Sequence, residues 1–458
     1  MNLNIKSDME NGERILKRSI SYASYFVSND VGMMAYERKR LYEKLCKSDL
    51  KDHGNVIPAS YLPLLFTYHD IGYFANIIKD VCGLLKKITE FYIQDSDYRR
   101  IFKLDRKLED LIMLPPSCDD ISPVGRVDVF LSDGGFKICE VNTDGTGGMS
   151  RADFINGEMA ANPMIRSLFP AAEVKSSVMK IAYEITKSYL RERKFPATAK
   201  KPMIAVVDFR EEGVFSDFDR FVEAFKFFGF DSEFADIRDL VFDGKNLFDK
   251  KSGKMIDVIY RRAVSSVVAD RIDECQNLLE AVKNRKITMI GDFRSTLMHS
   301  KSISAAVFHP KTFEKLTAVE RNFIDYCFPR TYFFDAESVD EKTLAYARSH
   351  KGEWVLKPQE GFASKGVVCG KDVSEKKWLE SLDSLFGSGY ILQEFCNSYK
   401  FPALRLDGSE IENIPVMIGL YFAAGQFAGL YNRAGANGII DYNHGGVYYP
   451  SVFTGTVE

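Results

Sequence analysis

The 458-residue sequence lacks several features that would place a protein in a class at once. Its eight cysteines are scattered and include no Cys-x-x-Cys pair, and its six histidines show no metal-ligand spacing. This pattern predicts reduced, mostly buried thiols, and histidines with structural or surface roles. A net charge of -3 gives no support for a nucleic-acid partner.

Long apolar runs are missing as well. The sequence begins MNLNIKSDMENGERILKRS, which has no apolar core of the kind found in signal peptides. No run approaches the ~20 apolar residues that a helix needs to cross a membrane. We therefore expect a cytoplasmic protein without a membrane partner. The sequence does not indicate its oligomeric state.

The composition is that of an ordinary globular protein, with 45% hydrophobic and 27% charged residues. The length predicts two or three structural units. Residues 12 to about 112 are predicted to be helical, because residues 59–93 have apolar side chains at helical spacing. We expect helices at 174–192 and 270–283, and strands at 201–209, 255–263 and 286–293. This alternation of strand and helix favours a parallel α/β layer.

The last third of the chain has a different pattern. Two strands joined by a glycine-containing loop are predicted within 352–370, followed by a helix at 373–386 and a strand at 390–395. Residues 414–435 are predicted to form a long hairpin with its turn near Gly425, and 396–413 a surface loop. An antiparallel sheet of this kind, together with the parallel layer, predicts a fold of the α+β and α/β classes.

One hairpin carries an unusual set of polar residues. In GRVDVFLSDGGFKICEVNTDGTGG, residues 125–148, side chains alternate between the two faces. The odd positions form the predicted core face; apart from Lys137 they are apolar: Val127, Val129, Leu131, Cys139 and Val141. The even positions bring a cation, two carboxylates and an amide toward one end of the hairpin: Arg126, Asp128, Glu140 and Asn142.

The pairing of the two strands depends on the turn. Asp-Gly alone suggests a two-residue turn, which pairs Asp128 with Cys139. A three-residue turn from Asp133 to Gly135 pairs Asp128 with Glu140 instead, and Arg126 with Asn142. We favour the second register because it separates an apolar face from a polar one. Opposed carboxylates repel unless something positive lies between them, and Mg²⁺ fits that role. A solvated charged end of an edge hairpin is the simpler alternative.

A second group of residues is typical of a phosphate site. Lys357 follows the apolar run 354–356 and precedes a loop that has glycines and a lysine. Backbone N–H groups and a point charge are what a polyphosphate needs, although such loops also occur without ligands. The strand YILQEF, residues 390–395, ends in polar residues and could line a base. Arg433 on a later strand is either a site residue or a surface residue.

Together these segments resemble the ATP-grasp enzymes. The hairpin looks like their metal-binding segment, with the pattern Arg-x-Asp and then Glu-x-Asn. In most ATP-grasp ligases that segment follows the lysines, whereas here it precedes them. This inverted order resembles the circularly permuted glutathionylspermidine synthase group. The similarity covers roughly residues 120–458 and includes SKSISAAVFH (300–309), but the loop EGFASKG departs from the group's usual Gly-Arg-Glu-Gly.

The resemblance implies an ATP-grasp fold in permuted order with four parts. These are an N-terminal helical region (1–112), the metal-binding hairpin segment (113–170), a Rossmann-like pre-ATP-grasp layer (171–299) and the nucleotide-binding part (300–458). It implies an ATP-dependent carboxylate–amine ligase that works through an acyl phosphate, with ATP and Mg²⁺ and with small-molecule acid and amine substrates. A phosphotransferase with the same fold and a non-catalytic nucleotide-binding scaffold are the alternatives; the intact hairpin residues argue against the scaffold.

The family pattern also implies roles for individual residues. Mg²⁺ would be held by Asp128, Glu140 and Asn142, and the γ-phosphate would be contacted by Arg126. Arg433 would stabilise the transferred charge, and Thr143 to Arg151 would border the acid substrate. The other nucleotide contacts would come from Lys301 and Lys357 at the α- and β-phosphates, Gly361, Ser364, Lys365 and Gly366 in the loop, and Gln393 and Glu394 beside adenine.

Overall fold

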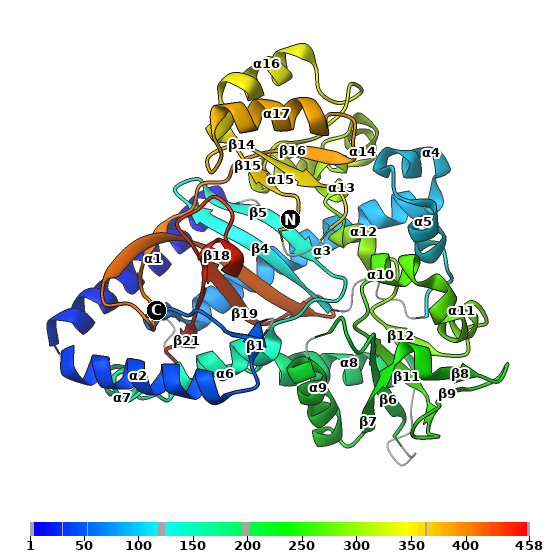
Figure 1. The fold of residues 1–458 in the computed structure, drawn as a ribbon, viewed down its shortest axis with the longest axis horizontal. Helices are drawn as coiled ribbons and strands as arrows, with labels where there is room; N and C mark the ends of the chain where they lie inside the picture. The colour runs from blue at the N-terminus through cyan, green and yellow to red at the C-terminus, as the bar shows by residue number, and fades with distance from the viewer. Residues whose placement is uncertain are drawn as a thin grey trace.

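The computed structural model describes residues 4–29, 31–52, 54–117, 124–193, 201–213, 215–361 and 364–455. The fold is a mixed α+β architecture of several sheets and helices. Figure 1 shows a central sheet, an α/β layer beside it, and a smaller sheet covered by helices α16 (Glu341–Ser349) and α17 (Glu375–Leu385). No helix in the described part of the chain is both long enough and apolar enough to cross a membrane.

The central antiparallel sheet has the order β20-β19-β18-β4-β5, and β17 also pairs with β18. The hairpin identified in the sequence forms β4 and β5, so its first strand lies inside the sheet and its second strand at the edge. The strands are β4 (Val124–Ser132), β5 (Gly135–Asn142), β17 (Lys400–Leu404), β18 (Ile411–Ala423), β19 (Gln426–Ala434) and β20 (Val447–Tyr449).

The predicted pairing of the hairpin is confirmed, but the predicted turn is wrong. Asp128 pairs with Glu140, and Arg126 with Asn142. The turn has two residues rather than three, because Ser132 pairs with Gly135. A β-bulge next to Asp128 leaves Cys139 as the extra residue on β5, and this shifts the register by one. The bulge therefore produces the pairing of Asp128 with Glu140 that was predicted from a three-residue turn.

The bulge also changes which residues of β5 face the core. Val127, Val129 and Leu131 of β4 are buried, as predicted. On β5 the buried apolar residues are Phe136, Ile138 and Val141, rather than the odd positions alone. Lys137 faces away from the core and donates to the carbonyl oxygen of Tyr326 at 2.5 Å. The prediction for the second strand was therefore wrong between the turn and the bulge.

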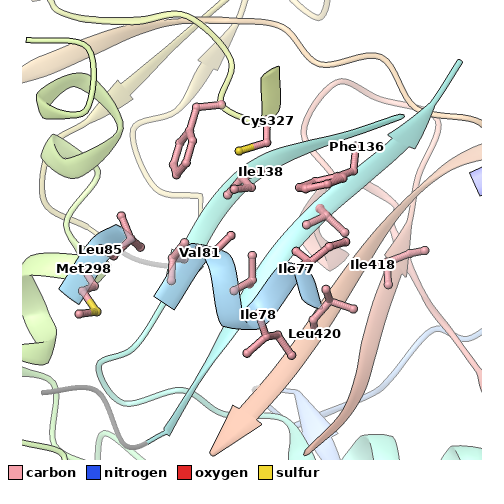
Figure 2. Packing of buried hydrophobic residues seen from close by; sticks show 14 of the residues in the cluster. Ile77, Ile78, Val81, Leu85, Phe136, Ile138, Met298, Cys327, Ile418 and Leu420 are labelled. Carbon is pink, nitrogen blue, oxygen red and sulfur yellow. The ribbon is translucent and has the colours of Figure 1, made fainter. Parts of the chain in front are cut away.

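Helix α3 (Tyr68–Gln94) covers the central sheet. Thr67 and Asp70 form a capping box at its start, which satisfies two backbone N–H groups. Figure 2 shows Ile77, Ile78 and Val81 of this helix in one apolar cluster with side chains of the hairpin and of β18. The other N-terminal helices are α1 (Ile5–Asn29), α2 (Val31–Lys47), α4 (Ser96–Arg99) and α5 (Arg106–Ile112).

The sequence predicted a helical N-terminal region, but the structure contains strands within it. Strands β1 (Lys51–Asp52), β2 (Asn55–Val56) and β3 (Leu64–Phe66) lie between α2 and α3. The run that leads into β3 contains Pro58 and Pro63, which remove backbone donors and disfavour a helix. β3 pairs in parallel with β21 (Ser451–Phe453). This pairing joins the N-terminal region to the C-terminal end of the described chain.

The parallel α/β layer is confirmed. Its sheet has the order β12-β11-β6-β7, and every pairing in it is parallel. A small antiparallel sheet, β8 to β10, was not predicted. The strands are β6 (Met203–Asp208), β7 (Asp231–Asp236), β8 (Leu240–Phe242), β9 (Leu247–Asp249), β10 (Met255–Ile256), β11 (Val258–Arg261) and β12 (Thr288–Ile290). The helices in this part of the chain are α6 (Met149–Ala160), α7 (Pro163–Leu168), α8 (Ser177–Arg193), α9 (Phe215–Phe227), α10 (Ser265–Asp270) and α11 (Gln276–Lys283).

The smaller antiparallel sheet has the order β13-β16-β14-β15. It contains the predicted strands on either side of the glycine loop. In the central sheet, the predicted hairpin turn at Gly425 joins β18 to β19. Residues 396–413 were predicted to be a surface loop, but they contain β17 and the start of β18. The elements are β13 (Thr331–Phe333), β14 (Trp354–Pro358), β15 (Val368–Cys369), β16 (Tyr390–Glu394), α12 (Ser295–His299), α13 (Ser302–Ala306), α14 (Pro310–Lys315), α15 (Ala318–Cys327), α16 (Glu341–Ser349) and α17 (Glu375–Leu385).

The packing of α3 gives a test of the fold. Ile78 is 0% exposed in the cluster of Figure 2, whereas Ile20 on α1 is 44% exposed. Ile78→Ala should lower the free energy of unfolding by about 2–5 kcal/mol, because it leaves a cavity in the core. Ile20→Ala, the same chemical change at the surface, should cost less than about 1 kcal/mol. Equal losses in chemical denaturation would show that α3 does not pack against the sheet as described.

Candidate functional site

A cavity of about 200 Å³ lies where the polar end of the hairpin meets the smaller antiparallel sheet. The structure brings most of the predicted site residues to its wall. Asp128, Lys365 and Gly366 do not line it. The predicted residues that do are Arg126, Glu140, Asn142, Lys301, Lys357, Gly361, Ser364, Gln393, Glu394 and Arg433.

Asp128 lies behind the cavity wall rather than in it, with 0% of its surface exposed. Arg126 donates to both of its carboxylate oxygens, at 2.5 and 2.8 Å. Asn142 donates to Oδ2 at 3.1 Å, and Arg433 lies 3.7 Å from the same oxygen. Burial raises the pKa of the Asp128 carboxyl, and Arg126 opposes this shift. Asp128 thus orients Arg126, Asn142 and Arg433 at the wall.

Space for this ion pair comes from a glycine on the neighbouring strand. Gly419 of β18 pairs with Asp128 of β4. A Cβ atom at Gly419 would lie 2.4 Å from the carbonyl oxygen of Tyr431 and 2.8 Å from Cδ of Arg126. Both approaches are closer than real Cβ contacts, so any side chain here would displace the strand or the guanidinium. A single glycine within an apolar strand has no pattern that would have identified it from the sequence.

Glu140 is the carboxylate that faces the cavity. Burial alone would raise its pKa, but the nearby cations Lys301, Lys357 and Arg433 outweigh burial and hold the pKa below its ordinary value. Asn142 donates to Oε1 of Glu140 at 3.2 Å. Glu140 is therefore an ionised acid among three cations. Because the cations outnumber it, this group of side chains has a net positive charge and attracts anions.

The two lysines are held by different partners. Lys357 donates to Oε1 of Gln393 at 2.6 Å, and Gln393 in turn donates to Oγ1 of Thr331 at 2.9 Å. This chain orders the side of the cavity formed by β14, β16 and β13. Lys301 donates to the carbonyl oxygen of Gly361 at 2.7 Å, so it ties the glycine loop to the segment after α12. Burial lowers the pKa of Lys301.

The glycine loop contributes less than the sequence predicted. Ser364 lines the cavity and has a positive φ of 56°, which a serine rarely adopts. Lys365 and Gly366 are exposed and lie outside the lining. Residues 362 and 363 of the predicted loop lie outside the described residues. Glu394 borders the cavity and accepts a hydrogen bond from the backbone N–H of Arg330 at 3.1 Å.

A second cavity, of about 230 Å³, adjoins the first. Arg126, Asn142 and His299 line both of them. The second cavity is bordered by Gly145, Thr146 and Gly147, which belong to the segment predicted to contact the acid substrate.

This segment is docked on the α/β layer. Asp144 lies 2.8 Å from Arg261 and accepts a hydrogen bond from Thr296 at 2.8 Å. The backbone N–H groups of Gly148 and Ser150 donate to Asp217 at 2.8 and 2.9 Å. These contacts fix the segment beside the second cavity.

Asp208 is the most perturbed acid of the second cavity. It ends strand β6 and is 6% exposed. Burial raises its pKa to about 7, and Arg262 opposes the shift only in part. Asp208 and Glu212, both in this cavity wall, were not identified from the sequence because an acid after a strand has no distinctive pattern.

Other wall residues of the first cavity were missed too. They include Phe130, Cys139, His299, Val355 and Met417. Cys139 reaches the wall only because of the bulge, and nothing in the composition indicates a bulge. His299 lies two residues before Lys301, but a single histidine without metal-ligand spacing gave no signal.

The donor groups allow one limited kind of metal site. In the described part of the chain no compact group of three His, Cys, Asp or Glu side chains could hold a metal ion by itself. Glu140 and Asn142 offer one charged and one neutral oxygen donor at the cavity wall, while Asp128 is bonded to Arg126. Such a partial set fits Mg²⁺ that also takes phosphate oxygens and water.

Comparisons with known proteins give one informative result. No protein-family model and no curated protein matches the sequence. Among solved structures, the chain is similar to a glutathione synthetase-like effector from Globodera pallida in its apo form, with a TM-score of 0.59 and 13% sequence identity. The match covers 91% of this chain and 96% of that chain. At this identity the likeness shows a shared fold alone.

The close packing at Gly419 predicts a specific loss. Gly419→Ala should lower the free energy of unfolding by several kcal/mol, about 3 or more, because the methyl group overlaps backbone and the Arg126–Asp128 pair. Gly83→Ala on α3 is the matched control, since nothing lies within 4 Å of the added atom. It should be neutral or stabilising by up to about 1 kcal/mol. Similar stabilities of the two variants would contradict the packing around Asp128.

The pKa of Asp208 predicts a pH-dependent effect. The folded protein favours the neutral carboxyl, because the folded pKa of about 7 lies above the ordinary value of 3.8. Ionisation of Asp208 therefore lowers the free energy of unfolding. The loss grows as the pH rises from about 4 to 7, and it keeps its full size above pH 7. Asp208→Asn removes that cost, so its stabilising effect should be larger at pH 8 than at pH 5. Thermal unfolding at both pH values, with the exposed Asp110→Asn as control, measures this; a larger effect at pH 5 would contradict it.

Proposed function

We propose that this protein is an ATP-dependent carboxylate–amine ligase of ATP-grasp organisation in permuted order. One observation carries the proposal. A single cavity wall combines the acid and amide of an early hairpin, Glu140 and Asn142, with cations from the last third of the chain. That combination suits a magnesium nucleotide, whose phosphates need cations and whose metal needs oxygen ligands.

The roles follow from the position of each residue. Glu140 and Asn142 would hold Mg²⁺ together with phosphate oxygens. Lys301 and Lys357 would neutralise phosphate charge, as compact ammonium groups do. The adenine would lie along the β16 side of the wall, near Gln393 and Glu394. Val355 and Met417 would offer it apolar contact.

The reaction would take place at the junction of the two cavities. A substrate carboxylate would attack the γ-phosphorus of ATP, which gives an acyl phosphate and ADP. An amine would then attack the acyl carbon, form the C–N bond and displace inorganic phosphate with loss of a proton. Arg126 and Arg433 would face the phosphoryl oxygens where charge develops. Fixed cations in such a site lower the barrier because they need no reorganisation.

The sequence order supports the permuted organisation. The hairpin with the acid pair precedes both lysines, as it does in the glutathionylspermidine synthase group that the chain resembles. A fold shared with a glutathione synthetase-like effector is consistent with this proposal. The segment 143–151 would then hold the acid substrate, and the α/β layer would form the far wall of its cavity.

A phosphate-release screen tests the reaction class. Purified protein with Mg-ATP is given small carboxylic acids and amines, singly and in pairs. We expect phosphate release that requires both an acid and an amine. Mass spectrometry should show one amide formed for each phosphate released. Phosphate transfer to a hydroxyl compound without any amine would identify a phosphotransferase instead. ATP binding without turnover on any pair would favour a scaffold.

A pair of lysine variants tests the nucleotide site. Lys357→Ala should weaken Mg-ATP binding by at least about tenfold, or 1.4 kcal/mol, because it removes a cation from the cavity wall. Lys365→Ala, outside the lining, should have a much smaller effect. Calorimetric titration with Mg-ATP measures both. An unchanged affinity in Lys357→Ala would remove this lysine from the site, and a larger effect at Lys365 would make the loop the principal phosphate contact.

A further inference from the structure

Three side chains separate the two cavities: Arg126, Asn142 and His299 line both. In the proposed reaction this is where the acyl phosphate meets the amine. The amide-forming step must remove a proton from the attacking nitrogen, and a nearby group has to accept it. The chemistry of the junction therefore depends on which of the three residues can take up a proton.

Arg126 and Asn142 cannot do so. Both already donate to Asp128, Arg126 through two bonds and Asn142 through one. A guanidinium has no acceptor lone pair, and an amide is too weak a base. Only the imidazole of His299 combines a donor with an acceptor nitrogen.

His299 is also available for this role. No described residue forms a hydrogen bond with either ring nitrogen, and Nδ1 is shielded from solvent. Burial lowers the pKa of the imidazole, and Asp144 opposes this shift. The ring is therefore neutral near pH 7 and has a lone pair that no protein group occupies. Buried polar atoms of this kind are rare, and each calls for an explanation.

The backbone on both sides of His299 is fixed. Helix α12 ends at His299, and the N–H of Ser300 donates to the carbonyl oxygen of Thr296 at 2.8 Å. The N–H of Lys301 donates to the carbonyl oxygen of Gln359 at 3.0 Å. The backbone that carries the imidazole is thus anchored before and after His299. A catalytic base needs such positioning, because proton transfer is sensitive to small displacements.

Other acids near the junction are less suitable. Asp144 is engaged by Arg261, by the N–H of Ser265 and by Thr296. Asp208 and Glu212 line the second cavity only and do not reach the first. Asp208 is the main alternative to His299 as the base, because the pKa of its carboxyl is raised to about 7. It therefore provides the matched variant for a test.

We propose that His299 is the catalytic base of amide formation: its neutral imidazole accepts the proton from the amine at the junction of the two cavities. The amine nitrogen bonds to the acyl carbon, the carbon–oxygen bond to phosphate breaks with its electron pair leaving on the phosphate, and the proton passes to a ring nitrogen. This proposal rests on the proposed ligase function, and it assigns no part to His299 in the first step.

Hydroxylamine separates the two steps. It is uncharged near pH 7 and attacks acyl phosphates without needing a base, so it reports acyl phosphate formation alone. With Mg-ATP and the acid found in the screen, His299→Gln should form hydroxamate at close to the wild-type rate. With the amine substrate, amide formation should fall by about 100-fold or more, the usual contribution of a general base. Asp208→Asn should not show this selective loss.

Each result decides between the proposals. Equal loss of hydroxamate and amide in His299→Gln would make His299 a structural residue, and no loss of either would exclude it as the base. A selective loss of amide in Asp208→Asn, and not in His299→Gln, would assign the role to Asp208. Wild-type protein that forms no hydroxamate with any acid would overturn the ligase proposal itself.

A second measurement does not need substrates. Nitrogen-15 NMR of the wild type, with His299→Gln used to assign the signal, shows whether the ring is neutral at pH 7. We expect one protonated and one unprotonated ring nitrogen. The charged and titratable groups that act on this ring are Asp144, Glu140, Lys301 and Arg126. An imidazolium at pH 7 would overturn the proposal, because it could not accept a proton.

Discussion

The buried pair of Arg126 and Asp128 is the constraint on which the candidate site depends. Removing two opposite charges from water costs several kcal/mol per ion, and only good geometry with further hydrogen bonds offsets this cost. Here the offset needs both strands beside β4. β5 supplies Asn142, and β18 supplies the open position at Gly419. The pair therefore locks the register of the hairpin to the sheet, and this register places Glu140 at the cavity wall.

Alternation along two strands was enough to predict the polar end of the hairpin. Arg126, Asp128, Glu140 and Asn142 meet as expected, because period-two patterning and the separation of faces restrict the register strongly. The means by which they meet was not predictable. A bulge adds one residue to a strand without a characteristic composition, so Cys139 could not be distinguished from a residue in regular pairing.

Local patterns also placed Lys357 and Gln393, because each stands at the end of an apolar strand. They failed where the site depends on contacts between distant segments. His299 and Asp208 line the cavities because the α/β layer docks against the hairpin, and no sequence period records that contact. Lys365 was expected at the site because lysine in a glycine loop is typical of phosphate sites, yet its side chain is exposed. The run 396–413 is polar and breaker-rich, and still pairs along β18, since a partner strand can override weak local preference.

The pairing of β3 with β21 has a consequence for how the molecule is made. Leu64 pairs beside Ser451, and β4 lies against β18, which begins at Ile411. A ribosome adds residues one at a time from the N-terminus, so β4 is synthesised long before the strand that covers it. During that interval the apolar side chains of the hairpin lack much of their final surroundings. Pairings this distant in sequence slow folding and prolong the exposure of unpaired strand edges. The central sheet therefore cannot be completed until the last third of the chain has left the ribosome.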